Sequence, residues 1–335
     1  MKVLVTGAGG FIGSHLCEEL LSRKYKVRAF LRYNSSQRLG WLKDINHKNL
    51  EIVFGDITDF DSVKNAVSGC DYVFNLAANI SVPYSFKNPQ TFIDTNILGA
   101  LNIFRSSLLE KKKIKKIIQI SSSEVYGNDL IKNSNILTER TITVSESPYA
   151  ASKIAADNLA LSMYKASGLP VIVARPFNTF GPRQSLRAVI ATIISQFVTL
   201  KKNKNVITVG NLNTSRDFVF VKDTVDGLIN LLKPACKAGE IYNICTGKSY
   251  KISEILKILN KITNNNPKIK ISKKRFRKAE VFNLKGSNKK LFTSSRWKPK
   301  YTDQKGFTKA LTETYNWFKE EKNISKYSNI TKYNI

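Results

Sequence analysis

A chain of 335 residues has room for one large domain and one smaller one, and its hydrophobic fraction of 42% is ordinary for a globular protein. It contains no apolar run of about 18 residues, which predicts no membrane insertion, and its two histidines are too few for a histidine-rich metal site, so no metal is predicted. The net charge of +29 leaves three explanations open: a basic cleft for anionic ligands, attraction to nucleic acid or an anionic membrane, and a solvated surface rich in lysine. Because Phe276 is the only aromatic residue clearly interleaved with a basic run, we favour the third explanation and expect no nucleic-acid partner.

Strands and helices alternate in the first half of the chain. In chain order, we predict strand 2–6, helix 11–24, strand 26–31, strand 50–55, helix 59–68, strand 71–76, helix 89–111, strand 116–120, helix 148–167 and strand 170–175. Such alternation predicts an α/β fold with a doubly wound parallel sheet of the Rossmann type.

The pattern becomes less regular after residue 181. We predict a helix near 187–202, a short strand near 206–209, and helices near 223–233 and 252–264. These elements predict a smaller C-terminal α/β domain.

The first strand leads directly into a turn rich in glycine. The turn consists of Gly7, Ala8, Gly9, Gly10, Phe11, Ile12 and Gly13. Gly7 allows a tight turn, Gly10 lets the backbone approach a pyrophosphate, and Gly13 lets the following helix pack close to the sheet. Because the N-terminus of that helix would face the phosphates, the spacing predicts a dinucleotide site.

A second group of polar residues follows the strand 116–120 and opens the helix 148–167. Tyr149 and Lys153 are four residues apart, so a helix places them on one face, with the ammonium beside the phenol. A neighbouring positive charge favours the phenolate, and we therefore predict that Lys153 lowers the pKa of Tyr149 toward the range of a base for alcohol oxidation. Ser122 would hold the same substrate oxygen, and Glu124 adds a carboxylate.

The residues after the second strand bear on the choice of cofactor. An acidic residue there binds the ribose hydroxyls of NAD, whereas an arginine accommodates the 2′-phosphate of NADP. The chain has Arg32, Asn34 and Ser35 at this place and no carboxylate before Asp44. We therefore favour NADP over NAD, with Arg32 and Ser35 on the phosphate. In the alternative, Arg32 stacks on adenine above an NAD ribose held by Asn34.

These motifs, together with others in the same order, resemble the extended short-chain dehydrogenase/reductases, and within them the NAD(P)-dependent nucleotide-sugar epimerases and dehydratases. The further motifs are Gly55-Asp56-Ile57, Asn75-Leu76-Ala77-Ala78, Asn96-Ile97-Leu98-Gly99, Arg175-Pro176-Phe177-Asn178, Gly181-Pro182-Arg183-Gln184 and the run from Arg216 to Asp223. The resemblance implies that the cofactor is contacted by Asp56, Ile57, Leu76, Ala77, Ala78, Asn96, Pro176 and Phe177. It implies that a nucleotide-sugar substrate is held by Asn178, Arg183, Arg216 and Arg275.

The resemblance also implies an organisation for the whole chain. Residues 1–180 would form the dinucleotide-binding domain with the Tyr149/Lys153 helix, residues 181–322 mainly the substrate domain, and residues 323–335 a loose polar tail. Family members commonly dimerise through the helices near 89–111 and 148–167, so we predict a homodimer. Since the first predicted strand begins at residue 2, the sequence leaves no room for a signal peptide, and we expect a cytoplasmic protein.

Within this family the reaction depends on what accompanies the Ser, Tyr and Lys residues. The run Ser122-Ser123-Glu124 is similar to the Thr-Ser-Glu of GDP-mannose 4,6-dehydratases. Because no aspartic acid stands at Ser123, Glu124 would take the C5 proton and deliver it to the C6 oxygen, with help from Ser123. The resemblance therefore predicts a 4,6-dehydratase.

Three segments also resemble dehydratases of the legionaminic-acid type, and they are Arg28–Ser35, Gly40–Leu42 and Pro176–Ser185. This similarity implies UDP- or GDP-N-acetylglucosamine as the substrate and a role in surface-glycan biosynthesis. A UDP-glucuronate decarboxylase and a nucleotide-sugar 4-epimerase are the alternatives within the family. From another class, a nucleic-acid-binding or scaffold protein is disfavoured by the presence of Ser122, Glu124, Tyr149 and Lys153.

Overall fold

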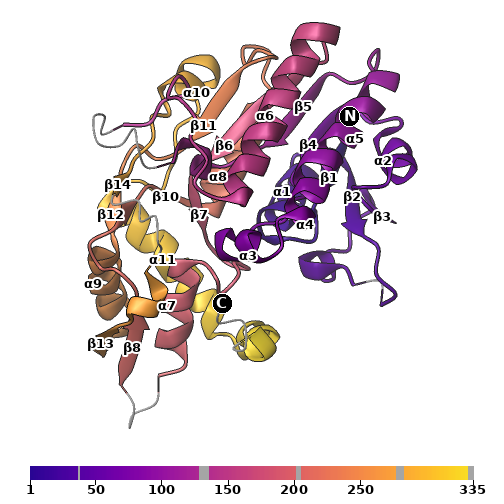
Figure 1. The fold of residues 1–335 in the computed structure, drawn as a ribbon. Coiled ribbons are helices and arrows are strands. Elements are labelled where there is room, and N and C mark those ends of the chain that lie inside the picture. The colour runs from indigo at the N-terminus through magenta and orange to yellow at the C-terminus, as the bar shows by residue number, and fades with distance from the viewer. Residues whose placement is uncertain (37, 128–135, 201–204, 277–282, 331–335) are drawn as a thin grey trace.

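The computed structural model describes residues 1–36, 38–127, 136–200, 205–276 and 283–330. Its largest element is a parallel sheet of seven strands in the order β11-β6-β5-β4-β1-β2-β3 (Figure 1). The strands are β1 (Lys2–Thr6), β2 (Lys26–Arg32), β3 (Leu50–Gly55), β4 (Tyr72–Asn75), β5 (Lys116–Ile120), β6 (Val171–Pro176) and β11 (Ile241–Ile244). The predicted α/β fold with a doubly wound parallel sheet is confirmed.

Helices cover both faces of this sheet because successive side chains of each strand point to opposite sides. In β1, Val3 and Val5 join the core beneath one set of helices, whereas Leu4 joins the core beneath the other. The first set includes α1 (Phe11–Ser22) and α8 (Val221–Asn230), and the second consists of α2 (Phe60–Val67), α5 (Gly99–Leu109) and α6 (Pro148–Ser167).

The predicted helix 89–111 is divided in the structure. It begins as α4 (Gln90–Phe92), widens into a π-helical turn, η2 (Ile93–Leu98), and continues as α5. Before it lies α3 (Val82–Lys87), which the sequence analysis did not predict. Because π-turns occur frequently at functional sites, the position of Asn96 inside η2 bears on the site.

The C-terminal part is built from short strands and helices. The strand pairs are β7 (Asn178–Phe180) with β10 (Phe218–Phe220), β9 (Ser215–Arg216) with β12 (Tyr250–Lys251) and β14 (Asn283–Leu284), and β8 (Val206–Val209) with β13 (Lys268–Ile271). The helices after α6, apart from α8, are α7 (Val189–Val198), α9 (Ile252–Thr263), α10 (Lys289–Ser295), α11 (Gln304–Lys319) and α12 (Glu321–Ile324). Of the predicted helices, the one at 187–202 is shorter in the structure, as α7, and the one at 223–233 begins and ends earlier, as α8.

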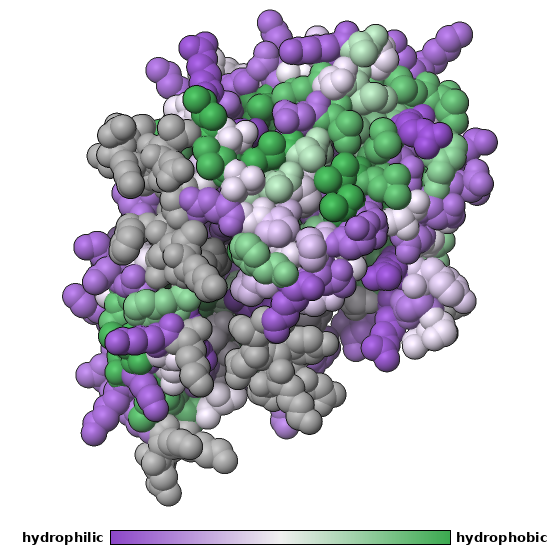
Figure 2. Space-filling view, viewed as in Figure 1, coloured by the Kyte–Doolittle hydropathy of each residue, from purple (hydrophilic) through white to green (hydrophobic). Residues whose placement is uncertain are grey.

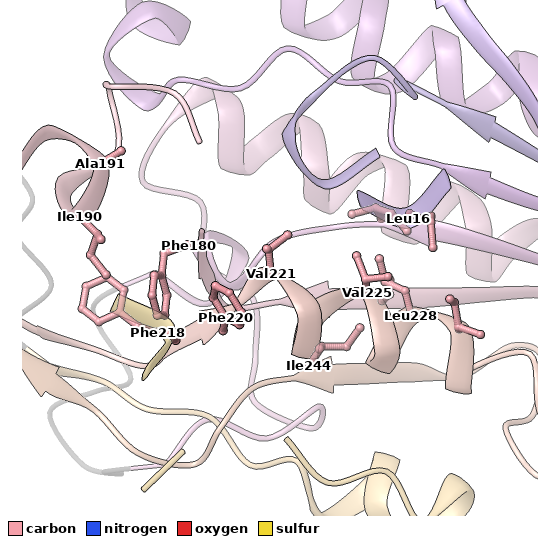
Figure 3. Packing of buried hydrophobic residues seen from close by; sticks show 14 of the residues in the cluster. Leu16, Phe180, Ile190, Ala191, Phe218, Phe220, Val221, Val225, Leu228 and Ile244 are labelled. Carbon is pink, nitrogen blue, oxygen red and sulfur yellow. The ribbon is translucent and has the colours of Figure 1, made fainter. Parts of the chain in front are cut away.

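One hydrophobic core joins this part to the large sheet. Figure 3 shows Leu16 of α1 close to Val225 and Leu228 of α8. The same core continues to Phe180, whose ring centroid lies 5.6 Å from that of Phe220. The division at residues 180/181 stays a prediction, but β11 lies beyond it and pairs with β6 in the large sheet.

The expectation of a loose tail from residue 323 is wrong as far as Tyr327. The chain continues there as α12 and the turn η5 (Ser325–Ile330), and the side chains of Asn323 and Tyr327 are each only 5% exposed. The polar composition was misleading because one aromatic residue, Tyr327, packs against the rings of Trp41 and Phe318. Residues 331–335 lie outside the described residues. Among the helices that the structure describes, none is long and apolar enough to cross a membrane.

Candidate active site

The candidate site lies at the carboxyl ends of β1 and β4, where the strand order reverses and where α/β sheets bind ligands. Three buried polar residues link these strand ends. Thr6 Oγ1 donates to Asn75 Oδ1 (2.7 Å), and Asn75 Nδ2 donates to Gln119 Oε1 (2.8 Å). Thr6 Oγ1 also accepts from the backbone N–H of Ala77 (3.0 Å), which fixes the loop after β4. This network of Thr6, Asn75 and Gln119 was not predicted, although Thr6 ends a predicted strand and the other two lie next to the ends of theirs.

The glycine turn has the geometry that a dinucleotide requires. Gly7 has a φ of +64°, and a Cβ added to Gly13 would lie 2.3 Å from the Gly7 carbonyl oxygen, so α1 packs directly on the turn. Gly10 is the N-cap of α1, and no described side chain caps the helix there. The first N–H groups of α1 are therefore free of side-chain partners and suit a pyrophosphate. The fit is good for the residues Gly7, Gly9, Gly10, Phe11, Ile12 and Gly13.

We predict that Gly13→Ala weakens dinucleotide binding at least about tenfold and lowers the free energy of unfolding by about 1–3 kcal/mol, because the new methyl group displaces α1 from the turn. Calorimetric titration with NADPH and urea unfolding measure the two effects. Glu19→Ala is the control, because Glu19 makes an exposed ion pair with Arg23 on the same helix and should change neither quantity appreciably. Unchanged NADPH affinity in Gly13→Ala would contradict the proposed fit.

The residues predicted for the adenosine ribose lie together after β2 and β3. The Arg32 side chain is 86% exposed, and its Nε lies 3.9 Å from Asp56 Oδ2. Asn34 donates to the Arg32 carbonyl (3.3 Å) and accepts from the backbone N–H of Arg38 (3.0 Å), while Ser35 is exposed. An exposed guanidinium at this place is compatible with either assignment made above.

The loop after β4 is held from both sides. Asn96 Oδ1 accepts from the backbone N–H of Asn79 (2.8 Å), and Asn96 Nδ2 donates to Ser152 Oγ on α6 (2.9 Å). The π-turn η2 thus joins the loop that carries Leu76, Ala77 and Ala78 to the helix that carries Tyr149. Ile57 is buried against Gly99, and its carbonyl accepts from Asn102 Nδ2 (3.1 Å).

Tyr149 and Lys153 lie in the first turns of α6, which begins where Ser147 Oγ accepts from the backbone N–H of Ala150 (3.1 Å). Their side chains are 8% and 4% exposed. Ser122 caps the 3₁₀ turn η3 (Ser123–Tyr126) and forms a hydrogen bond with Tyr149, and Glu124 lies close enough to act on the phenol electrostatically. The structure therefore brings Ser122, Glu124 and Tyr149 together, whereas Ser123 is buried.

The predicted effect of Lys153 on Tyr149 is wrong in this structure. Burial raises the pKa of Tyr149 to about 12; the hydrogen bond from Ser122 opposes this shift, and the charges of Glu124 and Asp157 add to it. The Lys153 ammonium instead donates to the Ile120 carbonyl (2.9 Å), and burial lowers the pKa of Lys153 to about 8. A positive charge brought beside the phenol by a bound ligand would favour the phenolate.

Behind Lys153 lies a buried ion pair that the sequence analysis missed. Arg175 Nη2 and Asp157 Oδ2 are 3.0 Å apart, and the same carboxylate oxygen accepts from Ser121 Oγ (2.9 Å). The Arg175 guanidinium lies 5.0 Å from the ring centroid of Tyr126. Asp157 follows Lys153 by one helical turn, and its charge opposes the fall in the pKa of Lys153. The spacing of four residues between Lys153 and Asp157 could have indicated from the sequence that the two side chains lie on one face of the helix.

Two residues predicted to contact the cofactor, Pro176 and Phe177, lie at the end of β6, where the resemblance places the nicotinamide. Phe177 is buried beside Tyr126, with ring centroids 6.3 Å apart. Its backbone N–H donates to the Ile244 carbonyl (2.9 Å). Pro176 is also buried, so contact of these two residues with a nicotinamide stays a prediction.

The predicted substrate residues differ in their surroundings. Asn178 Oδ1 is buried, and among the described residues it has no hydrogen-bond partner, which suits a ligand. Arg216 is the second residue of β9; it is buried and donates to the Ser215 carbonyl (2.9 Å). Arg275, in the turn η4 (Lys273–Arg275), is exposed and donates to the Thr208 carbonyl (2.5 Å). Its contact with a nucleotide stays a prediction.

Arg183 is engaged elsewhere. Its guanidinium makes two hydrogen bonds with the Glu18 carboxylate (2.7 and 3.0 Å) and one with Ser14 Oγ (3.1 Å), both on α1. These contacts join α1 to the loop after β7, and contact of Arg183 with a substrate stays a prediction.

Asp217, next to Arg216, is a second residue that the sequence analysis missed. Its buried carboxylate accepts from Thr246 Oγ1 (2.6 Å) and from the backbone N–H groups of Thr246, Gly247 and Gly286 (2.8, 2.9 and 3.2 Å). Burial raises the pKa of Asp217 to about 6, although the hydrogen bonds from these donors lower it. Asp217 thereby joins three segments around Arg216. Within the described ranges, no group of three or more His, Cys, Asp or Glu side chains is placed to hold a metal ion.

Comparison with known proteins identifies the family. The model of the family described as GDP-mannose 4,6 dehydratase matches residues 4–310. The chain belongs to this family. It is therefore an NAD(P)-dependent enzyme that modifies nucleotide sugars, within the extended short-chain dehydrogenase/reductases.

The proteins that this chain is similar to are named for several different activities. The chain is 31% identical to GDP-6-deoxy-D-mannose reductase of Pseudomonas aeruginosa, over 96% of this chain and 99% of the relative. It is 31% identical to GDP-mannose 4,6 dehydratase 1 of Arabidopsis thaliana, over 95% of this chain and 91% of the relative. Among solved structures, it resembles dTDP-glucose 4,6-dehydratase of Bacillus anthracis in complex with NAD, with a TM-score of 0.82 and 27% identity over 96% and 97% of the two chains. The structure of RMD from P. aeruginosa, with a TM-score of 0.78 and 29% identity over 95% and 98%, is complexed with NADPH.

Proposed function

We propose that the protein is a nucleotide-sugar 4,6-dehydratase, which removes water from its substrate to give a 4-keto-6-deoxy sugar nucleotide. The observation that carries this proposal is the placement of Glu124, on the turn η3, beside Tyr149. Oxidation and re-reduction at C4 need one acid–base group, whereas elimination across C5 and C6 needs a second. A carboxylate in addition to the phenol supplies it.

In the proposed mechanism, Tyr149 removes the proton of the C4 hydroxyl while Ser122 holds the same oxygen. When bound, the nicotinamide would supply the hydride acceptor for oxidation at C4 and the hydride donor for reduction at C6. The C4 ketone makes the C5 hydrogen acidic, and Glu124 takes that proton. Glu124 then delivers it to the C6 oxygen, which leaves as water. When C6 is reduced, C5 regains a proton, and this balances the proton that Tyr149 took from the C4 hydroxyl. Tyr149 and Ser122 therefore serve oxidation, and Glu124, with help from Ser123, serves elimination.

Residues of the same site support a proposal for the substrate and the cofactor. Asn178, with its unpartnered buried oxygen, and Arg216 are proposed to hold the diphosphate of a UDP- or GDP-linked N-acetylglucosamine. Asn178 and Phe218 are register partners in β7 and β10, two residues from Arg216. We propose NADP over NAD because Arg32 ends β2 and no carboxylate follows it before Asp44.

Mass spectrometry tests the function. Purified protein is incubated with UDP-N-acetylglucosamine, GDP-N-acetylglucosamine, GDP-mannose or UDP-glucuronate, each with NAD or NADP. Loss of one water from a sugar nucleotide, without net consumption of cofactor, is the expected result. Loss of carbon dioxide would establish a decarboxylase instead, and an unchanged mass with altered stereochemistry would establish an epimerase.

A reductase is a second candidate, favoured by the similarity over nearly the full length to GDP-6-deoxy-D-mannose reductase. A reductase consumes one reduced cofactor for each product, whereas the dehydratase regenerates its cofactor. Incubating the protein with a 4-keto-6-deoxy sugar nucleotide and NADPH therefore separates the two, because only a reductase oxidises NADPH in proportion to product.

We predict that Glu124→Gln slows dehydration by about 10²- to 10⁴-fold, the usual contribution of a general acid–base group, and leaves C4 oxidation in place. Reduced nicotinamide should then accumulate, which its absorbance measures during a single turnover. Glu110→Gln is the control and should behave as the wild type, because Glu110 follows α5 and its carboxylate accepts only from Ser68 Oγ (3.1 Å) among the hydrogen bonds of the described residues. Loss of both steps together would show that Glu124 does not act separately in elimination.

We further propose a homodimer formed through α5 and α6. Figure 2 shows apolar residues gathered over the region that α5 and α6 occupy in Figure 1. Leu98, Leu109 and Tyr164 are exposed there despite their size. We expect solution scattering to give the mass of two chains, and a monodisperse monomer would refute this assembly.

A further inference from the structure

The C-terminal strap, which we define as residues Glu321–Tyr327, packs against the segment that follows β2. That segment, residues 38–42, includes the turn η1 (Gly40–Leu42) and comes directly after the residues predicted for the adenosine ribose. The strap therefore contacts the cofactor half of the protein although it is some 280 residues away in the sequence.

The inner side of residues 38–42 touches the glycine turn. The backbone N–H of Trp41 donates to the Gly9 carbonyl (3.0 Å). A Cβ added to Gly40, which has a φ of +60°, would lie 2.4 Å from the Gly9 carbonyl oxygen. A Cβ added to Gly9 would lie 2.9 Å from the Leu39 carbonyl oxygen. Two backbones thus meet with no room for a side chain, so the placement of residues 38–42 and the shape of the glycine turn depend on each other.

The outer side of residues 38–42 is held by aromatic rings. The ring centroid of Trp41 lies 5.3 Å from that of Trp317 at the end of α11 and 6.1 Å from that of Tyr327 in the strap. The Lys326 ammonium lies 4.7 Å from the Trp41 ring centroid. Asn323 Nδ2 donates to the Trp317 carbonyl (2.9 Å), which fixes the strap to α11. Trp41 therefore lies between the glycine turn and a strap that is itself anchored.

The strap is also tied to the other side of α1. The buried hydroxyl of Tyr327 donates to the Gln184 carbonyl (3.1 Å). The neighbouring Arg183 is the residue that pairs with Glu18 of α1. Two segments that contact the glycine turn or α1 are thus connected to the same strap: residues 38–42 and the Arg183–Gln184 segment.

We propose that the C-terminal strap is a positioning element for the dinucleotide: through Trp41 it holds residues 38–42 against Gly9, and so it sets the affinity of the glycine turn for the adenosine half of NAD(P). The physical basis is preorganisation, because a segment already fixed in its bound position loses less freedom when the ligand arrives. The inference rests on the cofactor class of the family and not on the proposed sugar chemistry.

The test uses no sugar nucleotide. It measures the binding of NADPH and, in the protein without NADPH, hydrogen exchange at backbone amides. Trp317→Leu removes the support and leaves residues 38–42 unchanged, and a chain ending at Glu320 removes the strap. Trp317→Leu removes one of the two rings that hold Trp41, and the shortened chain removes the other. NADPH binding should therefore weaken about tenfold by calorimetry in each variant. Hydrogen exchange at the amides of residues 38–42 should become faster in Trp317→Leu.

Two further variants separate positioning from general stability. Trp41→Leu should weaken NADPH binding like Trp317→Leu, and Trp41→Phe, which keeps an aromatic ring, should restore affinity to within about threefold of the wild type. Tyr25→Leu is the matched control. Tyr25 packs against Tyr72 at the amino-terminal end of the sheet, so its loss should reduce thermal stability and leave NADPH affinity unchanged.

A measurement on the wild type applies even where a variant fails to fold. Coupling between two sites is reciprocal, so NADPH should slow hydrogen exchange at the strap amides of Asn323 and Ile324, which donate to the Glu320 carbonyl. Unchanged exchange in the strap on NADPH binding, or wild-type NADPH affinity in Trp317→Leu and the shortened chain, would overturn the proposal. A protein that binds NADPH as expected but dehydrates no sugar would contradict the proposed function alone.

Discussion

Replacing Tyr149 with phenylalanine is expected to lower the rate of C4 oxidation by about 10³-fold, within the range of a lost general base, while NADPH binding persists. The change removes only the phenolic oxygen, which carries the proposed proton transfer and the hydrogen bond with Ser122. The buried ring, which packs against Phe92 with centroids 6.2 Å apart, is kept. A large kinetic loss without a loss of binding would therefore assign the hydroxyl to the chemical step.

The pH dependence gives a second readout for the same residue. Burial raises the pKa of Tyr149 to about 12, so below that pH the phenolate is a minor species whose fraction grows as pH rises. We expect single-turnover oxidation by the wild type to accelerate with increasing pH and the residual rate of Tyr149→Phe to lose this slope. Tyr164→Phe, at an exposed position on the same helix, should retain both rate and slope. Retention of a tenth or more of the rate by Tyr149→Phe, with the wild-type slope, would assign the base to another group.

Sequence reasoning succeeded where short-range chemistry determines the structure. The strand 2–6, the glycine turn and the helix after it are contiguous, and each glycine of the turn has a backbone reason that its spacing already indicates. The i, i+4 relation of Tyr149 and Lys153 likewise follows from helical geometry alone. These features required no knowledge of distant contacts.

The missed elements depend on distant partners. β11 is four residues long, and it forms because Ile241 pairs with Val173 of β6, which no local pattern indicates. β9, β12 and β14 are two residues each and exist only as one another's neighbours. The folded strap has the same origin, since Tyr327 is fixed by rings that precede it by up to 286 positions, at Trp41.

The positions of the site residues were easier to predict from the sequence than their electrostatics. The positions of Tyr149, Lys153 and Glu124 were predictable, but the sign of the shift in the pKa of Tyr149 was not, because burial outweighs the nearby charges. Arg183 shows the same limit. Its residue type suits a diphosphate, yet Glu18 from a helix far away in the sequence binds its guanidinium. Competition among buried partners is visible only once the chain is folded.

The buried ion pair carries the second large prediction. We expect Arg175→Met to lower the free energy of unfolding by about 3–5 kcal/mol, because removing one partner leaves the other as an uncompensated buried charge. Among the described residues, Asp157 Oδ1 has no hydrogen bond, and Oδ2 would keep only Ser121. The charge of Lys153 also acts on Asp157, but the Lys153 ammonium donates to the Ile120 carbonyl and burial lowers its pKa to about 8, so it compensates the carboxylate only in part. Urea unfolding at neutral pH measures the loss. Lys222→Met, which breaks an exposed pair with Glu313, should cost less than about 1 kcal/mol.

Acid should relieve this destabilisation, and the sign follows from linkage. Burial raises the pKa of Asp157, and Arg175 opposes that shift, so its removal raises the pKa further above the value in the unfolded chain. The folded variant then binds more protons than the unfolded chain over a wider range of pH. Its free energy of unfolding therefore falls as pH rises through that range. The difference between wild type and Arg175→Met should therefore shrink as pH is lowered toward the ordinary pKa of an aspartate. Asp157→Asn combined with Arg175→Met should recover part of the loss at neutral pH, since no buried charge remains. An equal loss at every pH, with no recovery in the double variant, would mean that packing of the Arg175 side chain against Tyr126, and not its charge, holds this part of the site together.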